Sequence, residues 1–490
     1  MQLKSYFQSF KLILVVALIV RLVAVVFSAG YGMHDDHFLV IEASASWVDG
    51  FDYNRWLPWT PGNEHRPDGH SFTYVGLNFL FFKFLKFIGI VDPMIQMFLN
   101  RLIHALASLV VVWYGMKITE KLSDRCTAYK TGWILALLWV LPFLSVRNLV
   151  EVAPLPFLMY ATWLSLDEPK KRTFILVGIL TGLAISFRYQ IGVFAVGVAL
   201  YYFFTKQFVP LVNYCLGILI CFSATQGVVD YFIWGYPFAE FFGYVTYNMD
   251  AGAAYMTNKN YFMYFLVLSG VLFVPLGMLM MIGFFKSYKK YAILFIPTLL
   301  FLLFHSFYPN RQERFILTVL PYFIILGTMG FALFHTRRSE KWWNVSMIVF
   351  WILNIPMLLI ATFMFSKKSR VESMYSIYND SLVHKRILLE GTSANRVSML
   401  PKYYSGKWDF EFVDRIHDTT HLKVNPQHDY DFVFFFDEQD LSNRISAYKA
   451  IYPEMELVKK CYPGFADVKL RQLNPRNANE YIEVWRTNAH

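Results

Sequence analysis

The stretch FKLILVVALIVRLVAVVFSA, residues 10–29, decides the fold class, because only Lys11 and Arg21 in it are charged. A helix of about 20 apolar residues is long enough to cross the hydrocarbon core of a bilayer. A short segment with one basic residue, Lys4, precedes this run, as in a signal peptide, but no clear small-residue cleavage site follows it. We therefore expect an uncleaved first membrane helix.

Similar apolar runs recur over the first three quarters of the chain, which has 490 residues and is 56% hydrophobic. One soluble core of this length does not absorb so much apolar surface. The expected fold is a polytopic α-helical membrane protein with about eleven spans. We place the spans at 10–29, 95–117, 130–146, 150–166, 173–187, 190–205, 208–227, 261–285, 291–307, 315–335 and 343–365.

An additional apolar stretch at 73–90 determines the expected orientation. If it lies along the surface, four loops rich in Lys and Arg face the cytoplasm, as the positive-inside rule favours. These loops are 117–130, 167–172, 285–290 and 335–341. Lys83 and Lys86 also suit an interfacial helix better than a bilayer centre. We thus expect the N-terminus inside, a large first loop (30–72) outside, and the C-terminal part outside.

Charge separates two domains. Residues 1–366 hold 27 basic and 18 acidic residues, whereas residues 367–490 hold 18 basic and 17 acidic residues. The positive excess therefore lies in the membrane part, where loop orientation explains it without any nucleic acid. In the tail, YDFVFFFDE and EYIEVWR read as strands and LSNRISAYKAIYP as a helix. We expect a transmembrane module at 1–366 and a small extracytoplasmic α/β domain at 367–490.

The first outer loop opens with MHDDHF, residues 33–38, and continues to Glu42. The adjacent carboxylates of Asp35 and Asp36 suit general-base chemistry, such as proton removal from an attacking sugar hydroxyl. A solvated polar loop or a helix cap is the alternative reading. A metal site built from residues 34–37 is a further one, but adjacent residues rarely all point at one ion. We expect no metal and no cofactor.

Arginines on the outer side form the second part of the predicted site, because guanidinium groups bind phosphate bidentately. They are Arg66, Arg188, Arg311 and Arg314. The last two lie three apart in the hairpin NRQERF, where Glu313 can orient one of them. A charged residue between membrane helices is by default a candidate functional residue. A structural Arg–Glu pair is the alternative interpretation here.

Other polar or aromatic residues on the outer side can be explained by a structural role as well as by a functional one. Arg147 and Glu151 lie four apart and can pair with each other. Trp56 and Trp59 are typical of a membrane-interface belt. Asp230 lies in apolar surroundings. A basic pocket opposite an acidic pair suits a donor whose leaving group is a phosphate on a lipid.

The order of these motifs resembles the family 22 glycosyltransferases, the GPI and lipid-linked-oligosaccharide mannosyltransferases of the GT-C superfamily. In that family a first luminal loop carries Asp-Glu-x-aromatic followed by a Glu, and a late loop carries His-Lys-Glu-Glu-Arg-Phe before a Pro-containing helix. The resemblance covers about residues 10–335. The positions that match are Asp35, Asp36, Glu42, Arg311, Glu313, Arg314, Phe315 and Pro321.

The resemblance implies a GT-C fold and transfer of a sugar, mannose or another hexose, from a polyprenyl-phosphate carrier to a glycan or lipid-linked acceptor. It also implies inversion at the sugar and no metal. Asp35, alone or with Asp36, is then the base. The expected donor-phosphate and substrate contacts are Arg66, Arg188, Arg311, Glu313, Arg314, His37, Glu42 and Asp230.

This sequence departs from the family pattern at three positions. Asn310 stands where the family has His, Gln312 where it has its first Glu, and His34 where Pro is common. These departures bear on the sugar and the acceptor more than on the reaction class.

Other functions stay open at this point. Within enzymes, a GT-C relative of the protein O-mannosyltransferase or aminoarabinose-transferase type is the runner-up. A transporter of lipid-linked glycans needs ionisable residues near the bilayer midplane and usually an internal repeat. Only Arg21 lies mid-span, and no repeat is visible. A purely structural or sensory membrane protein would not need the acidic pair and the arginines. The expected location is a bacterial inner membrane or the ER membrane, with the active site extracytoplasmic.

Overall fold

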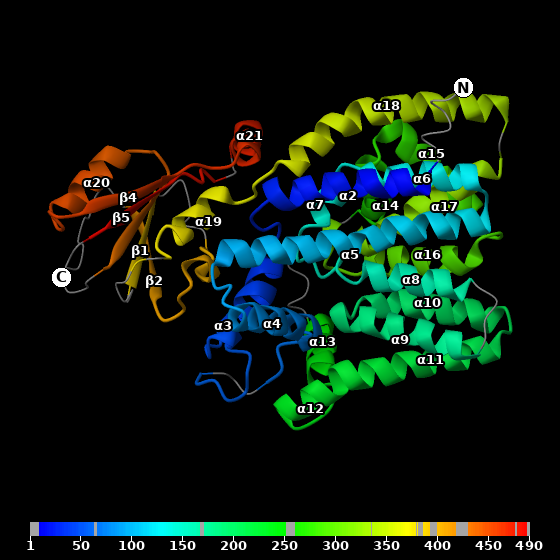
Figure 1. Ribbon diagram of the computed structural model, residues 1–490, viewed down its shortest axis with the longest axis horizontal. Helices are drawn as coiled ribbons and strands as arrows, with labels where there is room; N and C mark the ends of the chain where they lie inside the picture. The colour runs from blue at the N-terminus through cyan, green and yellow to red at the C-terminus, as the bar shows by residue number, and fades with distance from the viewer. Residues whose placement is uncertain are drawn as a thin grey trace. The chain divides into compact units, whose positions relative to one another are not determined.

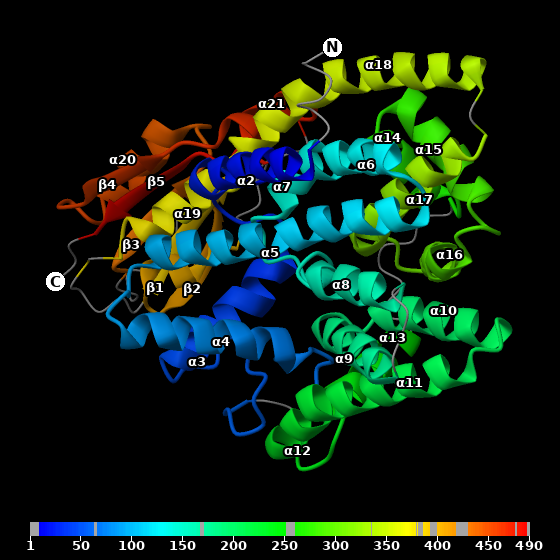
Figure 2. The same ribbon diagram turned by 45° about the vertical axis from the view of Figure 1, so that its right-hand side comes forward.

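The computed structural model describes residues 9–62, 66–166, 171–250, 260–334, 336–378, 380, 386–392, 399–417, 430–475 and 478–487. Within these residues the chain forms two compact units (Figures 1 and 2). The first unit comprises the described parts of Met1–Val25, Arg55–Leu77 and Asn100–Thr362. The second comprises the described parts of Val26–Asn54, Asn78–Leu99 and Phe363–His490.

The first unit is helical, as the repeated apolar runs predict (Figure 1). Two of its helical elements are of other types, namely the π-helix η2 and the 3₁₀-helix η4. Helices α4 (Phe72–Phe87) and α5 (Pro93–Leu122) contribute residues to both units. The other elements of this unit are α2 (Phe10–Phe27), α6 (Arg125–Leu137), α7 (Val140–Leu144), α8 (Leu155–Ser165), α9 (Lys171–Phe187), α10 (Ile191–Phe204), α11 (Phe208–Phe222), η2 (Ser223–Gly227), α12 (Val228–Trp234), α13 (Ala239–Met249), α14 (Met263–Val271), α15 (Val274–Lys286), α16 (Ala292–Phe307), η4 (Glu313–Val319), α17 (Leu320–Ala332) and α18 (Arg337–Thr362).

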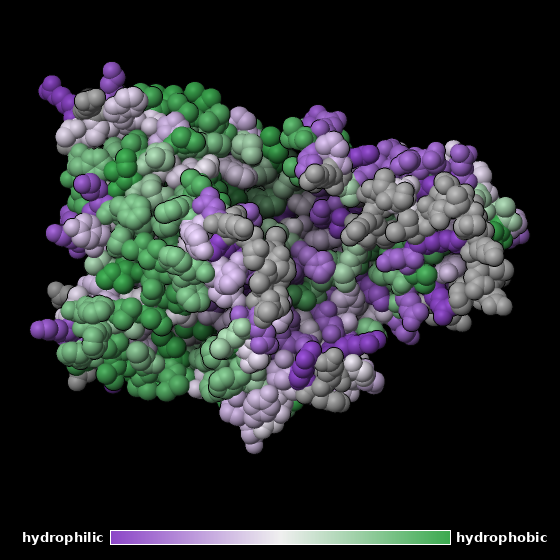
Figure 3. Space-filling model, turned by 180° about the vertical axis from the view of Figure 1, so that it is seen from behind, coloured by the Kyte–Doolittle hydropathy of each residue, from purple (hydrophilic) through white to green (hydrophobic). Residues whose placement is uncertain are grey.

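Several of these helices are long and apolar enough to cross a membrane. They are Phe10–Phe27, Pro93–Leu122, Phe208–Trp234, Glu313–Ala332 and Ser339–Thr362, and shorter apolar helices accompany them. Hydrophobic side chains also cover the outer surface of the helices, as the left part of Figure 3 shows. The prediction of a multi-pass membrane protein is therefore supported, while the count of eleven spans stays a prediction.

The predicted span at 261–285 is wrong as one continuous helix. Helix α14 ends at Val271 and α15 begins at Val274, with Phe273 in the left-handed region at φ 59°. The two helices pack against each other, since a Cβ on Gly277 would lie 2.0 Å from the carbonyl oxygen of Ser269. The apolar run alone did not reveal this break. The predicted span at 130–146 is divided in the same way, between α6 and α7.

Helix α17 lies at the centre of the first unit. All its residues from Leu320 to Phe331 are buried, as expected for a helix that is hydrophobic on every side. Glycines let α15 approach it closely, because a Cβ on Gly330 would lie 1.8 Å from the carbonyl oxygen of Gly283. Such contacts between small residues are typical of helix packing in membranes.

Arg21, the charged residue within the first apolar run, has a structural partner at the end of another helix. Its guanidinium donates to the carbonyl oxygens of Ala136 at 3.1 Å and Ala17 at 3.2 Å, and to the hydroxyl of Ser108 at 2.7 Å. Ala136 lies in the last turn of α6, whose carbonyl groups lack helical partners. These bonds explain a mid-span arginine without a transport pathway.

The second unit contains a five-stranded sheet, which confirms the predicted small α/β domain. The strand order is β2-β1-β3-β5-β4. Strands β1, β2 and β3 run parallel, whereas β5 pairs antiparallel with β3 and β4. The elements of this unit are η1 (Asp36–Glu42), α3 (Ala43–Val48), α19 (Lys368–Tyr375), β1 (Arg386–Thr392), η5 (Lys402–Ser405), β2 (Glu411–His417), β3 (Phe432–Phe436), α20 (Leu441–Lys449), β4 (Glu456–Cys461), α21 (Phe465–Leu473) and β5 (Ile482–Arg486).

Both faces of this sheet are covered, so its central strands are apolar throughout. In β3, Phe434 belongs to the core beneath α19, and Phe435 packs with Tyr448 of α20 on the other face. The sequence predicted β3, β5 and α20 correctly. A fully buried ion pair joins β1 to α20, with Nε of Arg444 2.8 Å from Oε2 of Glu390.

Candidate functional site: an acidic π-helix and an arginine cluster

The predicted acidic pair lies at the start of the π-helix η1. Asp35 precedes this helix and its side chain is 45% exposed, whereas Asp36 is its first residue and is 4% exposed. π-Helices are rare and occur frequently at functional sites. The two adjacent carboxylates therefore differ in environment, and Asp35 is the one that is open to an incoming ligand.

His37 and Glu42 form a buried pair within η1. Nε2 of His37 lies 3.2 Å from Oε1 of Glu42. The imidazole is stacked between the rings of Tyr31 and Tyr404, at centroid distances of 4.6 Å and 5.6 Å. Both side chains are fully enclosed, so they support η1 and are not exposed to a substrate in this structure.

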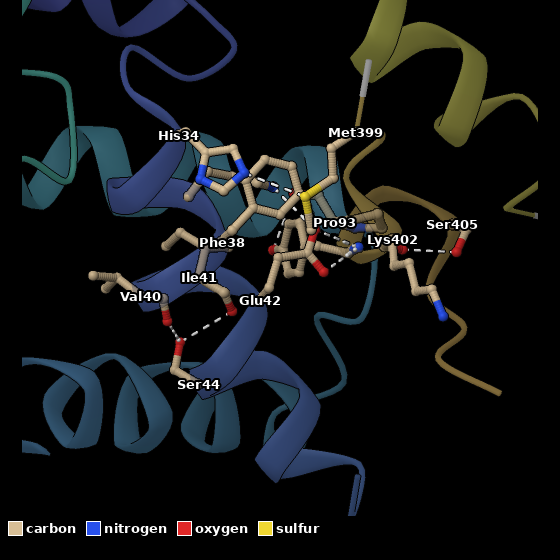
Figure 4. A network of polar contacts seen from close by, with 12 residues as sticks. His34, Phe38, Val40, Ile41, Glu42, Ser44, Pro93, Met399, Lys402 and Ser405 are labelled. Carbon is tan, nitrogen blue, oxygen red and sulfur yellow. Dashed lines mark hydrogen bonds and ion pairs between the residues drawn. The ribbon is translucent and has the colours of Figure 1, made fainter. Parts of the chain in front are cut away.

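Glu42 also anchors η1 to a distant part of the chain. The backbone N–H of Tyr403 donates to both carboxylate oxygens of Glu42 at 3.1 Å. Figure 4 shows Glu42 directed from η1 toward η5, near Lys402 and Ser405. On the exposed side of η1, Nε2 of His34 lies 3.2 Å from the sulfur of Met399. The acidic helix is thus held by residues about 360 positions later in the chain.

The first unit brings two of the predicted arginines together on Glu151. The guanidinium of Arg188 lies 3.0 Å from Oε1 of this carboxylate, and that of Arg314 lies 3.8 Å from the same oxygen. Both guanidiniums also lie over the ring of Phe315, at 5.4 Å and 5.8 Å from its centroid. We call Glu151, Arg188, Arg314 and Phe315 the arginine cluster.

Local structure explains why these residues converge. Pro321 lies in the first turn of α17, where its missing N–H is tolerated, and the preceding residues form the 3₁₀-helix η4 that carries Arg314. The hydroxyl of Thr318 in η4 donates to the carbonyl oxygen of Glu151 at 2.9 Å. Arg188 follows the end of α9 at Phe187. The cluster is therefore positioned by three separate segments.

Arg311 and Glu313 are the other predicted residues of the NRQERF hairpin. Arg311 is buried with its guanidinium 4.5 Å from the ring centroid of Tyr261. Glu313 is exposed, and the residue that holds Arg314 is instead Gln312, whose Oε1 accepts a hydrogen bond of 2.8 Å. An orienting role of Glu313 stays a prediction.

The loop that contains Arg66 is anchored by Glu240, a residue that the sequence reasoning missed. Oε2 of Glu240 accepts hydrogen bonds from the N–H groups of Gly69 at 2.7 Å and His70 at 2.9 Å. Gly69 has φ +80° and approaches the backbone of Tyr244 so closely that a Cβ would lie 2.8 Å away. Arg66 itself is exposed on this loop.

Asp230 belongs to the same hydrogen-bonded network. Its carboxylate accepts bonds from the side chain of Gln226 at 2.7 Å and from the backbone N–H of Glu240 at 2.9 Å. Burial, with a smaller effect from the charge of Asp230, raises the pKa of Glu240 to about 7, against the hydrogen bonds that its carboxylate accepts. Asp230 thus connects α12 to α13. Trp56, expected in a membrane belt, is instead buried and stacked on His70 at 4.3 Å.

Among the residues that the structure describes, no group of three or more His, Cys, Asp and Glu side chains is arranged to hold a metal ion. The acidic helix lies in the second unit and the arginine cluster in the first. That the acidic pair and the arginines face each other stays a prediction.

The residues that hold these sites in place include Glu240, Glu151, Tyr403 and Tyr404, and little in the sequence pointed to any of them. Glu240 was the easiest of them to predict, because it is a lone carboxylate in the apolar run FAEFF. Glu151 was assigned only to pair with Arg147. Tyr403 and Tyr404 could not be linked to residue 37 or 42, since nothing in a single sequence connects segments so far apart.

Comparison with known families decides the class of the protein. A model of the Alg9-like mannosyltransferase family matches residues 12–387, which is most of the chain. The chain belongs to the Alg9-like mannosyltransferase family. It is therefore a glycosyltransferase, and the resemblance to family 22 enzymes drawn from its motifs is confirmed.

Solved structures show the fold of this Alg9-like protein. ArnT from Cupriavidus metallidurans in the apo state is 13% identical, with a TM-score of 0.59 over 98% of this chain and 97% of that chain. ArnT bound to undecaprenyl phosphate is 12% identical, with a TM-score of 0.61 over 98% of both chains. The similarity shows a GT-C fold. A search of the curated proteins finds no match.

Proposed function

We propose that this Alg9-like protein transfers mannose or another hexose from a polyprenyl-phosphate carrier to a glycan or lipid-linked acceptor. Family membership supports the sugar transfer. The similarity in fold to an ArnT structure that holds undecaprenyl phosphate supports a lipid-linked donor. A donor with a long lipid tail also explains why the enzyme is embedded in the membrane.

The observation that carries the proposal is the pairing of Arg188 and Arg314 on one buried carboxylate. Two guanidiniums on one side of Glu151 form a site of concentrated positive charge, with the Arg188 side chain still 20% exposed. Such a pair stabilises the negative charge that develops on a departing phosphate. We propose that these two arginines bind the donor phosphate, with Arg66 and Arg311 as further candidates.

The proposed reaction uses Asp35 as the general base. The acceptor hydroxyl oxygen attacks the anomeric carbon while the bond from that carbon to the phosphate oxygen breaks. The hydroxyl proton passes to the carboxylate of Asp35, and the electron pair leaves with the polyprenyl phosphate. One displacement on the face opposite the leaving group inverts the anomeric configuration. The exposure of Asp35 supports this role over Asp36.

Within the same proposal, His37 and Glu42 position the base. Their buried contact and the two hydrogen bonds from Tyr403 hold η1 in one conformation. A rigid support of this kind fixes a catalytic carboxylate within the narrow range of geometry that proton transfer needs. We therefore assign them a positioning role instead of the substrate contacts expected from the sequence.

An assay of the purified protein with a panel of labelled polyprenyl-phosphate sugars tests the proposal. We expect label transfer from one donor and a product of inverted configuration. Asp35→Asn should lower transfer by roughly a hundredfold or more, because general-base catalysis contributes about 10²–10⁴-fold, while donor binding persists. Asp52→Asn, in the same loop, is the matched control and should keep near-normal transfer.

Three outcomes would contradict parts of this proposal. Transfer by Asp35→Asn within about tenfold of the wild type, a loss of roughly 1.4 kcal/mol, excludes the base. Absence of transfer from every donor, with lipid-linked glycan movement across vesicles, favours the transporter alternative. Transfer to a protein or to a lipid A-type acceptor favours the protein O-mannosyl or aminoarabinose type.

The topology belongs to the same proposal. We propose eleven spans with the N-terminus inside, an extracytoplasmic active site, and a soluble domain at 367–490. The last segment of the second unit begins at Phe363, which supports a boundary near residue 366. That unit also includes 26–54 and 78–99, so the acidic loop packs with the C-terminal domain.

A further inference from the structure

Helix α21 leaves an apolar face uncovered in the second unit. Phe465 is 68% exposed, Leu470 54% and Leu473 83%, and none of the residues of this helix is buried. At 100° per residue, Phe465, Leu470 and Leu473 fall within an arc of about 140°. Asp467 and Arg471 project from the opposite side. The helix is therefore amphipathic, with its hydrophobic side turned away from the protein.

One polar side chain of α21, that of Asp467, is partly buried against the second unit, whereas Arg471 is exposed. Asp467 interacts electrostatically with Lys367, Arg370 and Glu480. Lys367 and Arg370 both pair with Glu480, at 2.7 Å and 2.9 Å. This charged group orients the helix, so the outward direction of its apolar face is set by contacts within the second unit.

The start of α21 lies next to the chain as it leaves a candidate membrane span. A Cβ on Gly464 would lie 2.5 Å from the carbonyl oxygen of Phe365. Phe365 follows the end of the span Ser339–Thr362 by three residues, a reach of about 11 Å at most. Figures 1 and 2 both show α21 beside the segment that links α18 to α19.

A second candidate span ends at the same place. The ring of Phe27, the last residue of α2, lies 4.9 Å from that of Phe363. Gly30 is paired with Ser366 in an isolated bridge. The residues that end or follow two candidate spans thus lie beside the start of α21 within the second unit, which favours a position of this helix near the membrane surface.

We propose that α21 is an interfacial helix that docks the C-terminal domain on the lipid bilayer. Phe465, Leu470 and Leu473 enter the boundary between headgroups and acyl chains, as amphipathic helices do. Lys469 lies 5.8 Å from the ring centroid of Phe465 and extends to the lipid phosphates. The partner surface is a bilayer with anionic headgroups. This inference goes beyond sugar transfer and does not depend on it.

Spin-label accessibility in the full-length protein tests the proposal. The label is placed at Leu473→Cys after replacing the two exposed cysteines, Cys126→Ser and Cys215→Ser. Ser446→Cys on α20, whose hydroxyl is exposed, is the control. In vesicles of phosphatidylglycerol and phosphatidylethanolamine that hold only this protein, we expect the label at 473 to collide more with oxygen than with a water-soluble nickel complex. The label at 446 should show the opposite.

Two results would overturn the proposal. A label at 473 as accessible to nickel as the label at 446 means that α21 lies in water. A label at 473 shielded from both reagents means that protein, here a second copy of the chain, covers the face instead of lipid. Replacing Leu470 and Leu473 together by Glu should abolish the oxygen preference of a label placed at Phe465→Cys, whereas Ser442→Glu and Ser446→Glu on α20 should not.

Discussion

At the residue scale, Glu151 is the carboxylate on which the arginine cluster depends. The same oxygen approaches two guanidiniums, and the side chain is almost fully buried. Without its charge, Arg188 and Arg314 lose the carboxylate that pairs with both of them. Removing one partner from a buried ion pair destabilises a protein by roughly 3–5 kcal/mol. Glu151 therefore neutralises part of the positive charge of this cluster.

We predict that Glu151→Gln lowers the thermal stability of the ligand-free protein. Glu120→Gln is a close control, because Glu120 also has cations at 3.0 Å and 3.8 Å, Lys117 and Arg125, but is 30% exposed. An exposed pair of this kind contributes about 0–1 kcal/mol. The measurement is the melting temperature of each variant in detergent, and we expect a larger decrease for Glu151→Gln than for Glu120→Gln. Equal melting temperatures would show that the cluster does not need its carboxylate.

Glu240 makes a prediction about pH. Its pKa of about 7 in the folded protein is above the ordinary value of 4.5, chiefly because of burial. The folded state therefore holds this proton more tightly than the unfolded state. The stability that results is complete below pH 4.5 and is lost as the pH rises to about 7, a change of roughly 3 kcal/mol.

The measurement compares melting temperatures of the wild type and Glu240→Gln from pH 5 to pH 8. Gln cannot ionise, so we expect the wild type to lose stability relative to the variant over this range. The difference between the two curves isolates Glu240 from other titrating groups. Parallel curves across the range would exclude the effect.

At the element scale, glycines determine how the membrane helices pack. Helices α9 and α11 approach through Gly178 and Gly217, where an added Cβ would lie 2.2 Å from the backbone oxygens of Tyr214 and Ile175, respectively. Backbone atoms cannot yield as the end of a side chain can. The apolar runs predicted both helices, but the pairing of these two glycines appears only when the helices are placed together.

We predict that Gly217→Ala destabilises the first unit and lowers the yield of folded protein, because the new methyl group collides with α9. Gly270→Ala in α14 is the control, since a Cβ there meets nothing within 4 Å. Alanine at an exposed helical site is favoured over glycine by roughly 0.5–1 kcal/mol. Size-exclusion profiles and melting temperatures compare the two variants. A control less stable than Gly217→Ala would refute the packing argument.

At the scale of the whole molecule, the proposed topology places one native cysteine and the C-terminal domain on opposite sides of the membrane. Cys126 is exposed and lies in the first turn of α6, within the basic segment 117–130. In a Cys215→Ser background, we predict that an impermeant maleimide labels Cys126 only after the membrane is permeabilised. Ser446→Cys, the reporter for the C-terminal domain, should be labelled in intact cells. Labelling of both from the same side would contradict the eleven-span topology.

The site was predictable from the sequence only in part. Asp35 and Asp36 followed from two adjacent carboxylates after a span, and Arg188 and Arg314 from charges beside apolar runs. The sequence did not reveal which carboxylate is exposed, because the burial of a side chain depends on tertiary packing. Likewise Gln312, and not Glu313, holds Arg314, since helical spacing does not apply in the extended backbone before η4.

The sequence by itself determined the membrane class, the reaction family and strands β3 and β5, and it supplied the candidate residues of the site. These depend on local composition, on periodicity and on short motifs, which are properties of neighbouring residues. Only the tertiary structure decided that Glu151 collects two arginines, that Glu42 anchors η1 to Tyr403, and that α14 and α15 are separate helices. Those features arise from packing between distant segments. The free energy of burial and of ion pairing depends on which segments that packing brings into contact.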